Sequence, residues 1–241
     1  MNLEYIHKNH ITSDIWEIVF KKPKNFKFKP GQFIETYIDD PNPDERGNKR
    51  WFTISSSPTQ STISITTRLI SPKHSEFKND LFNLEPNQTI SIKNPEGSFI
   101  LPSKNTKILW LAGGIGITPF MSQLQYMFDT KDFERDIILL HGLRTLEEDP
   151  CADLIQKCQK VMPKLKIIRV LSESSPTNWR GPTGYIDKNL LSKQVPDLTR
   201  RDIYISGPEP MVDAFTEMLV SVGVNKDQLH QDWFPGYTEK Y

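Results

Sequence analysis

The sequence has few cysteines and no excess of charge of either sign. Only Cys151 and Cys158 occur among its 241 residues, and both fall in a segment with the pattern of a helix. Two cysteines are too few for a disulfide framework or a cysteine-ligated metal centre, so we interpret them as ordinary helix residues in a reducing compartment. The 30 basic residues balance 30 acidic ones, which excludes the overall positive charge typical of proteins that bind nucleic acids.

Long hydrophobic runs are also lacking. No apolar stretch reaches the roughly 18–20 residues that a membrane-spanning helix needs. The opening residues, MNLEYIHKNH, contain no apolar core of the signal-peptide kind. We therefore expect no membrane span and a location in the cytoplasm. Aromatic residues make up 10% of the chain, which argues against disorder, and the length corresponds to roughly one and a half to two domains.

The first hundred residues have the pattern of an antiparallel β domain. Short runs rich in β-branched and aromatic residues alternate with stretches that contain turn-forming residues. One helix is expected over residues 75–84, where Phe77, Leu81 and Leu84 recur at helical spacing. Short strands without long intervening helices predict a small barrel or sandwich. The strands are expected at residues 15–20, 31–38, 50–56, 61–70 and 88–94.

After about residue 103 the pattern changes to apolar strands that alternate with amphipathic helices. Such a pattern predicts a parallel sheet with both faces covered. We therefore expect two domains, an antiparallel β-barrel over residues 1–103 and an α/β nucleotide-binding domain over residues 104–241. The strands of the second domain are expected at 107–114, 136–143, 165–172 and 202–207, with helices at about 118–128, 153–161 and 210–222.

Two strand-to-helix turns in the second half have the composition of ligand-binding turns. In LAGGIGITPF (111–120), Gly113, Gly114 and Gly116 would allow a ligand to approach the backbone closely. The helix that follows offers free N–H groups to a phosphate. ISGPEPM (205–211) has the same organisation. Because parallel strands end at one edge of a sheet, the two turns together indicate a site for an extended ligand, although either one alone could serve packing.

A third segment, RWFTISSSP (50–58), lies in the predicted barrel and combines a cation, two aromatic rings and several hydroxyls. These groups could serve one planar, phosphorylated ligand. On a strand, Arg50 and Phe52 share one face while Trp51 and Thr53 share the other. An amphipathic strand with a surface arginine would have the same local pattern.

Taken in order, these segments resemble the ferredoxin–NADP reductase superfamily of flavoenzymes. The resemblance implies a flavin-binding β-barrel followed by an α/β domain that binds a nicotinamide nucleotide, with no metal. It covers almost the whole chain. The matching segments are residues 50–53, Gly97–Ser98–Phe99, GGIGITP (113–119), the Gly–Pro–x–x–Met pattern at 207–211, and HQDWFPGY (230–237).

On the flavin side, the resemblance implies that Arg50 pairs with the flavin pyrophosphate and that the Thr53 hydroxyl reaches flavin N5, the atom that accepts hydride. Phe52 stands where the family usually has a tyrosine packed on the isoalloxazine ring. An intact second phosphate-binding segment favours FAD over FMN, although His74 occupies a position where glycine is common. The other residues implied at the flavin are Trp51, Thr67, Arg68, Leu69, Ser75, Phe77 and Lys78.

In the second domain, the resemblance implies a nicotinamide dinucleotide held by the two turns. Ser206 replaces the cysteine that the family often has beside the nicotinamide. Glu173 follows Ser172 where NADPH-specific members have arginine, and a carboxylate there repels a 2′-phosphate. We therefore expect NADH, although Arg144 and Arg180 could still supply positive charge. The other implied residues are Gly114, Gly116 and Thr118 at the pyrophosphate, and Gly207, Pro208 and Met211 at the nicotinamide end.

The tail resembles one branch of the superfamily, in which an acidic residue and a phenylalanine two positions further on lie against the flavin. Asp232 and Phe234 match that pattern, so the expected catalytic residues are Thr53, Asp232 and Phe234, with Phe234 also at the cofactor. Tyr237 or Tyr241 could close over the ring instead, and Asp232 could equally be a solvated carboxylate at a strand end.

The expected activity is that of an NAD(P)H-dependent FAD oxidoreductase that passes electrons to a separate carrier, namely a ferredoxin, a flavodoxin or an oxygenase component. Such catalysis depends on how the protein positions the two cofactors, because the cofactors themselves supply the electron-transfer chemistry. A free-flavin reductase that uses flavin as substrate is the alternative enzyme, and a regulatory module without turnover is the alternative class. We expect a monomer with no nucleic-acid partner, and we interpret His141 and His230 as ordinary hydrogen-bonded residues.

Overall fold

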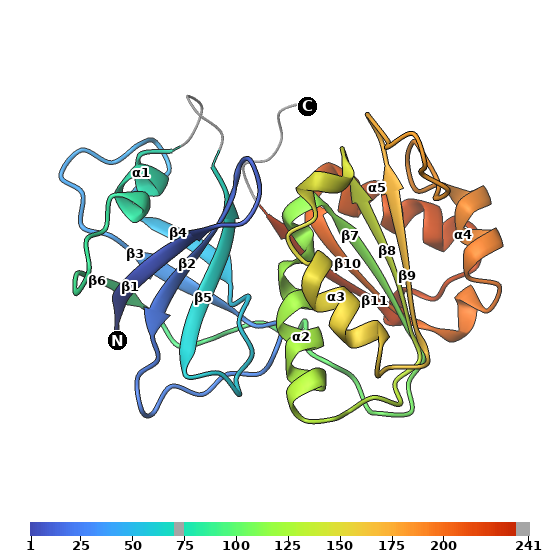
Figure 1. Ribbon diagram of the computed structural model, residues 1–241, viewed down its shortest axis with the longest axis horizontal. Helices are drawn as coiled ribbons and strands as arrows, with labels where there is room; N and C mark the ends of the chain where they lie inside the picture. Colours follow the sequence, from blue (N-terminus) through green and yellow to red (C-terminus); the bar gives the residue numbers. More distant parts are fainter. Residues whose placement is uncertain (70–74, 235–241) are drawn as a thin grey trace. The chain divides into compact units, whose positions relative to one another are not determined.

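The structure is a computed structural model that describes residues 1–69 and 75–234, with the backbone alone for Phe234. The chain separates into two compact units. The first comprises residues 1–100 and 118–126, and the second comprises residues 101–117 and the chain from residue 127 onward. The first unit holds an antiparallel sheet and the second a parallel one (Figure 1). This confirms the fold class that the two sequence patterns predict.

Six antiparallel strands form the sheet of the first unit, in the order β4-β3-β6-β1-β2-β5. Alternating side chains fill its interior. On β2, for example, Ile18 and Phe20 share one face and are both buried. Helix α1 is capped by Ser75, whose side chain accepts a hydrogen bond from the backbone N–H of Lys78. The elements are β1 (Asn2–His10), β2 (Ile15–Lys21), β3 (Phe33–Tyr37), β4 (Lys49–Thr53), β5 (Thr62–Arg68), α1 (Glu76–Phe82) and β6 (Thr89–Ile92).

Hydrogen bonds just beyond the end of β4 join the two outermost strands. The N–H of Ser55 donates to the carbonyl of Ser64 on β5 at 2.9 Å. The N–H of Ser64 in turn donates to Ser56 Oγ at 2.9 Å. Thr66 Oγ1 then donates to Ser55 Oγ at 2.8 Å. These bonds close the sheet into a barrel-like unit, so the hydroxyls of Ser55 and Ser56 serve the fold.

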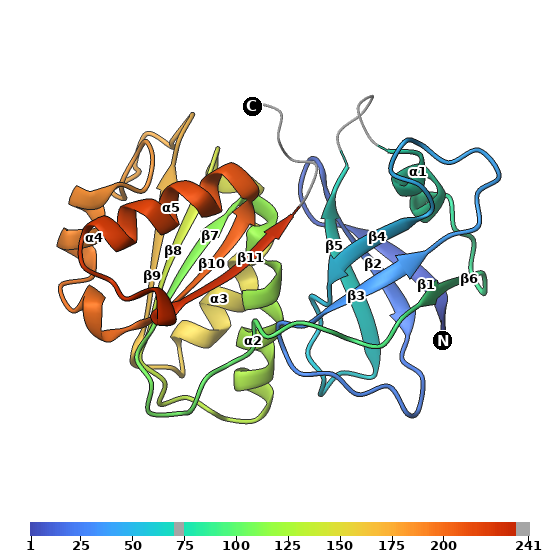
Figure 2. The same cartoon turned by 180° about the vertical axis from the view of Figure 1, so that it is seen from behind.

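Five parallel strands form the sheet of the second unit, in the order β11-β10-β7-β8-β9. Helix α3 covers one face, while α4 and α5 cover the other, as the two opposite views show (Figures 1 and 2). The strands are β7 (Ile108–Gly113), β8 (Ile137–Leu143), β9 (Leu165–Leu171), β10 (Asp202–Pro208) and β11 (Leu229–Phe234). The α-helices of this unit are α3 (Ala152–Gln159), α4 (Lys188–Gln194) and α5 (Glu209–Ser221), whereas most of α2 (Thr118–Asp129) belongs to the first unit.

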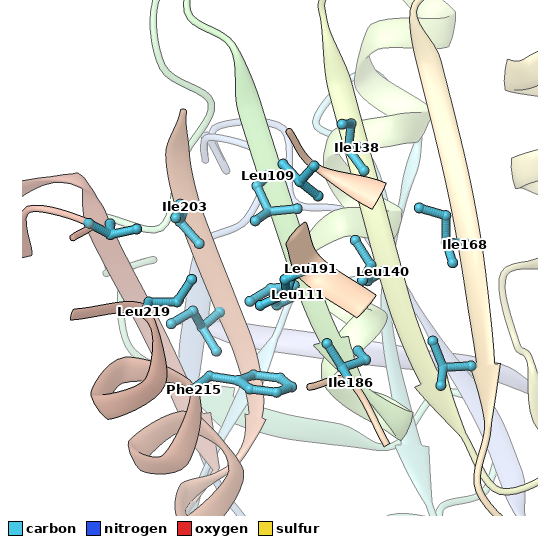
Figure 3. Packing of buried hydrophobic residues seen from close by; sticks show 14 of the residues in the cluster. Leu109, Leu111, Ile138, Leu140, Ile168, Ile186, Leu191, Ile203, Phe215 and Leu219 are labelled. Atoms are coloured by element: carbon cyan, nitrogen blue, oxygen red, sulfur yellow. The ribbon is translucent and has the colours of Figure 1, made fainter. Parts of the chain in front are cut away.

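One face of this sheet packs against α4 and α5 through aliphatic side chains (Figure 3). Leu111 on β7 and Leu140 on β8 are fully buried, as are Leu219 on α5 and Ile205 on β10. Burying each such side chain contributes roughly 1.5–3 kcal/mol to folding. Because this face is apolar, the polar groups of the sheet lie near the carboxyl ends of its strands.

Sequence patterns missed three elements. Strand β1 carries Leu3 and Tyr5 inward in alternation, a signal that the sequence does contain. Helix α4 is short, and Asp187 caps it by accepting from the N–H of Leu190. Strand β11, whose sequence is LHQDWF, pairs in parallel with β10. Within residues 1–69 and 75–234, no helix is both long and apolar enough to cross a membrane.

Candidate functional site

Three of the predicted flavin residues converge in the first unit. Phe52 lies 6.1 Å from Phe77 between ring centroids, with the rings tilted by 33°. The guanidinium carbon of Arg50 lies 5.2 Å from the centre of the same Phe77 ring. Arg50 and Phe52 share a face of β4, as alternation predicts, and both contact α1. Trp51 projects from the opposite face and is 49% exposed.

Asp44 occupies much of the hydrogen-bonding capacity of Arg50. Arg50 Nη2 donates to both oxygens of Asp44, at 2.6 and 2.7 Å. Its Nη1 donates to the carbonyls of Arg46, Gly47 and Lys49. Burial raises the pKa of Asp44, but the hydrogen bonds from Arg50 and from a backbone amide outweigh it, and the net pKa is lowered. Within the described residues, Arg50 Nε is buried without a hydrogen-bond partner.

Arg50, Phe52 and Phe77 form what we call the Arg50 cluster. The chemistry of these side chains fits a flavin and its pyrophosphate. The orphaned N–H of Arg50 is a charged donor that lacks an acceptor, and buried donors normally have one. Phe52 and Phe77 offer aromatic surface beside it. Thr53 is 5% exposed, and its hydroxyl makes no side-chain hydrogen bond within the described residues. That hydroxyl therefore remains available to a ligand.

The second predicted phosphate segment is built partly on internal contacts. Thr67 and Arg68 end β5 and are buried, and Arg68 Nε lies 3.4 Å from Asp14. Lys78 Nζ donates to the Arg68 carbonyl at 2.7 Å. Leu69 is partly buried and packs against the barrel core. His74 lies outside the described residues, as do Tyr237 and Tyr241.

A row of residues that is polar on four of the five strands crosses the second sheet near the carboxyl ends of these strands. Backbone register places five residues side by side, one on each strand. Interior parallel strands are normally apolar throughout, so a polar row marks this edge, where ligands bind in such sheets. In sheet order the row is Asp232, Ser206, Ala112, His141 and Arg169.

At one end of this row, Ser206 contacts Asp232. Ser206 is fully buried, and its Oγ donates to Asp232 Oδ2 at 3.3 Å. Burial raises the pKa of Asp232 to about 6, although the hydrogen bond from Ser206 acts to lower it. Asp232 is partly buried in the structure, and its hydrogen bond to Ser206 ties it to the end of β10. The Phe234 backbone pairs with Pro208 at the end of β11.

The glycine turn after β7 packs tightly against the end of β10. A Cβ at Gly116 would lie 2.2 Å from the Ser206 carbonyl oxygen, and one at Gly113 would lie 2.2 Å from Met211 Sδ. Gly207 would meet Met211 Cε at 2.4 Å. These glycines bring the two predicted turns together. Pro208 follows as the N-terminal flanking residue of α5, and Thr118, which begins α2, is buried.

Gly114 differs from its neighbours in the same turn. It has a φ of +51°, and a Cβ there would meet nothing within 4 Å. The backbone at Gly114 is thus open to a ligand, as a dinucleotide would require, while the other glycines serve close packing. The open backbone at Gly114 is compatible with the close approach of a nicotinamide dinucleotide.

A buried network supports Gly114 from behind. His141 Nε2 lies 2.9 Å from the Gly114 carbonyl oxygen, and because a carbonyl only accepts, Nε2 carries the hydrogen. His141 Nδ1 lies 3.8 Å from Asp149. Asp149 accepts from Arg169 Nε at 2.6 Å and from the N–H of Cys151 at 2.9 Å. Burial lowers the pKa of His141 against the opposing effect of Asp149, so the imidazole is neutral at pH 7.

The predicted ribose-side residues lie at the ends of β8 and β9. Ser172 Oγ donates to the Leu143 carbonyl at 3.3 Å, and the N–H of Glu173 donates to the Arg144 carbonyl at 3.1 Å. The Arg144 guanidinium pairs with Glu148, with Nη2 to Oε1 at 2.6 Å. Arg180 is exposed in the loop after β9.

The sequence patterns single out none of three residues in these clusters, namely Asp44, Glu148 and Asp149. Asp44 lies in a stretch that has the composition of a turn, and Glu148 and Asp149 lie in a short loop. Glu148 carried one signal, since it follows Arg144 by four residues, the spacing of a helical ion pair. His141 was assigned an ordinary hydrogen-bonding role, and its partner proves to be the glycine turn itself.

Comparison with known proteins shows which domain family and which folds the chain is similar to. Residues 110–217 match the family described as the oxidoreductase NAD-binding domain. A ferredoxin NADP+ reductase from Neisseria gonorrhoeae, solved with bound FAD and NADP, has a TM-score of 0.79 at 18% identity over 96% of this chain and 97% of that chain. The Amycolatopsis cytochrome P450 reductase has a TM-score of 0.81 at 18% identity, over 97% of this chain and 70% of its own.

Residues 110–217 are thus similar to an oxidoreductase NAD-binding domain. The chain has the same two-domain fold as the ferredoxin NADP+ reductase from Neisseria gonorrhoeae, which confirms the fold that the sequence resemblance implies.

Among curated relatives, the glycine betaine monooxygenase reductase subunit of Chromohalobacter salexigens is 29% identical over 93% of this chain. The xylene/toluene monooxygenase electron transfer component of Pseudomonas putida is 30% identical over 94% of it. The chain spans 62% and 63% of the lengths of these two relatives.

Proposed function

We propose that this protein is an NAD(P)H-dependent FAD oxidoreductase that passes electrons to a separate carrier, namely a ferredoxin, a flavodoxin or an oxygenase component. The observation that carries the proposal is the similarity to reductase components of oxygenases along 93–94% of the chain. The Arg50 cluster and the glycine turn support it, because they supply one flavin-like and one dinucleotide-like site. As domains we propose residues 1–103 for the flavin and 104–241 for the nicotinamide nucleotide.

On the flavin side, the chain's own residues would bind and orient the cofactor. Arg50 would donate its remaining N–H to the pyrophosphate, and Phe52 with Phe77 would lie beside the ring system. The second phosphate segment would favour FAD. When bound, FAD accepts a hydride and can release electrons one at a time. The other residues proposed to line the flavin are Trp51, Thr67, Arg68, Leu69, His74, Ser75 and Lys78.

On the nicotinamide side, Gly114 would expose its backbone to the dinucleotide phosphates, as its positive φ and open surroundings allow. Gly116 and Thr118 would complete the turn. The nicotinamide end would be bordered by Ser206, Gly207, Pro208 and Met211, and the ribose side by Arg144, Ser172 and Glu173. We infer a preference for NADH from the acidic Glu173.

Three residues would act at the reacting rings. Thr53 would orient flavin N5 with its unused hydroxyl, and Phe234 would control access to the ring. Asp232, when ionised, would place a negative charge beside Ser206 where positive charge develops as hydride leaves the nicotinamide. We further propose a monomer that works in the cytoplasm.

The test is anaerobic reduction of the purified yellow protein with NADH and with NADPH, followed by absorbance of the flavin. We expect rapid bleaching with NADH. Absence of bleaching with both nucleotides would overturn the proposed activity and favour a binding module without turnover. Bleaching that is as fast with NADPH would overturn the NADH preference alone.

A free-flavin reductase remains the second candidate, and the Asp44–Arg50 pair is the observation that favours it. Because Asp44 already satisfies Arg50 Nη2, the flavin phosphates gain fewer charge-assisted bonds, and a flavin that dissociates easily can act as a substrate. Protein that purifies colourless yet oxidises NADH when FMN or riboflavin is added would support this candidate over the first.

A further inference from the structure

The carboxyl ends of β8 and β9 carry two arginines, each neutralised by a buried acidic residue. Arg144 Nη2 lies 2.6 Å from Glu148 Oε1, and Arg144 Nε donates to Glu148 Oε2 at 3.2 Å. Asp149, the residue after Glu148, accepts a hydrogen bond from Arg169 Nε at 2.6 Å. Glu148 and Asp149 are 9% and 6% exposed, whereas the side chains of Arg144 and Arg169 are 34% and 21% exposed.

A third acidic residue, Glu173, lies close by along the chain. It is the second residue after β9 and is exposed, and its backbone N–H donates to the Arg144 carbonyl at 3.1 Å. The backbone bond therefore ties the segment that carries the exposed Glu173 carboxylate to Arg144. The forked geometry of the Arg144–Glu148 pair uses the same donors that an arginine offers to a phosphate.

The strand order places this corner on the adenosine side of the proposed dinucleotide site. From the glycine turn after β7 the chain proceeds to β8 and β9 on one side, whereas β10 lies on the other. The order in which the chain adds strands therefore reverses between β7 and β10. Dinucleotides bind in such sheets at this reversal point. With the nicotinamide end at Ser206 on β10, the ribose lies toward β8. This step rests on the proposed function.

We propose that Glu148 is a specificity-determining residue that makes this protein select NADH over NADPH. By holding Arg144 in a two-point ion pair, Glu148 removes the cation that would receive a 2′-phosphate. A free ribose diol needs no such cation and can donate to the carboxylate of Glu173. The selection is therefore made by an ion pair inside the protein as well as by the carboxylate that faces the ligand.

The test compares Glu148→Gln with Glu147→Gln. Glu147 is the matched control, because it lies in the same loop, is exposed and makes its hydrogen bonds to its own backbone and to Thr145. The dissociation constants of NAD+ and NADP+ are measured by titration calorimetry on wild type and both variants. Anaerobic reduction by NADH and NADPH is measured on the same preparations. Far-UV circular dichroism and thermal unfolding check that each variant is folded, and Glu148→Ala serves as a second variant.

We expect wild type to bind NAD+ at least tenfold more tightly than NADP+. Glu148→Gln should shift this ratio toward NADP+ by about tenfold, with a parallel shift in the reduction rates, and Glu147→Gln should leave the ratio within twofold of wild type. Unchanged ratios in folded Glu148→Gln and Glu148→Ala would overturn the inference, as would wild type that binds NADP+ as tightly as NAD+. If nucleotide binding shifts as expected but neither nucleotide reduces the flavin, the proposed activity fails while the role of Glu148 stands.

Discussion

Both carboxylate oxygens of Asp44 lie within hydrogen-bond distance of Arg50 Nη2, at 2.6 and 2.7 Å. Asp44→Asn removes the charge from this pair and leaves a buried guanidinium poorly compensated, which should cost about 2 kcal/mol of stability in the flavin-free protein. If the flavin pyrophosphate also bonds Arg50, added FAD should restore more stability in the variant than in wild type.

The measurement is thermal unfolding of flavin-free protein with increasing FAD. A matched control is Asp39→Asn, an acidic residue of the same loop region with no bond to Arg50. Equal FAD-induced shifts in the midpoint for wild type and Asp44→Asn would argue against a shared site on Arg50.

Thr53→Val tests the unused hydroxyl on β4. Valine keeps the shape and the β propensity, so folding and flavin content should change little. The rate constant of flavin reduction should fall by about tenfold or more, because a hydrogen bond at the reacting atom is lost. Stopped-flow absorbance under anaerobic conditions measures this rate, and Thr53→Ser should retain most of it. A Thr53→Val rate equal to wild type would remove Thr53 from the mechanism.

His141 should control dinucleotide affinity through Gly114. His141→Leu deprives the Gly114 carbonyl of its donor, which costs roughly 1–2 kcal/mol and should raise the dissociation constant of NAD+ by about 5–30-fold. His141→Gln retains an N–H that can reach the carbonyl and should recover part of the loss. A purely structural role for His141 would lower the unfolding temperature in both variants without this difference in NAD+ affinity.

The raised pKa of Asp232 predicts that the rate of flavin reduction changes with pH near 6. Its carboxylate form prevails above that pH, so flavin reduction should slow as pH falls through about 6, and Asp232→Asn should be slow with a flat profile. The effect on stability has the opposite sign. A raised pKa means that the folded state binds the proton more tightly than the unfolded state, so ionisation destabilises the fold above about pH 4. Asp232→Asn should therefore raise the unfolding temperature at pH 8 but not at pH 3.

The lowered pKa of Asp197 predicts the pH range in which the second unit loses stability in acid. Burial acts to raise the pKa of Asp197, but hydrogen bonds from Arg201 and Lys107 lower it to about 2. An unfolded aspartate titrates near 3.9. The pair therefore contributes about 2 kcal/mol above pH 4, and this contribution is lost as pH falls from about 4 to 2. Asp197→Asn should be less stable than wild type at pH 7, and the difference should disappear as pH falls through 2, as judged by urea unfolding.

Alternation along single strands was enough to predict part of the site. On β4 it placed Arg50 and Phe52 on one face, and both contact Phe77. The glycine and proline pattern likewise located the turns after β7 and β10. These features depend on local backbone geometry, which neighbouring residues determine.

Features that depend on strand pairing could not be predicted in this way. The polar row from Asp232 to Arg169 requires the register of five strands, and register is a property of the packed sheet. Strand β11 lacks an apolar pattern, and it is a strand because β10 supplies its hydrogen bonds. The Asp44–Arg50 pair required the fold of a loop whose residues predict only turns.

The turn that precedes β11 has consequences at the far end of the sheet. Asn225 and Gln228 cap it reciprocally, and Gln228 Nε2 also donates to the Arg201 carbonyl at 2.9 Å, just before β10 begins. This clamp sets the phase of β11, so that Asp232 meets Ser206. Deleting or inserting a single residue in that turn would shift β11 by one position along β10, so that Gln231 or Trp233 would stand opposite Ser206 in place of the acid. The length of a surface turn therefore decides which side chain lies beside Ser206.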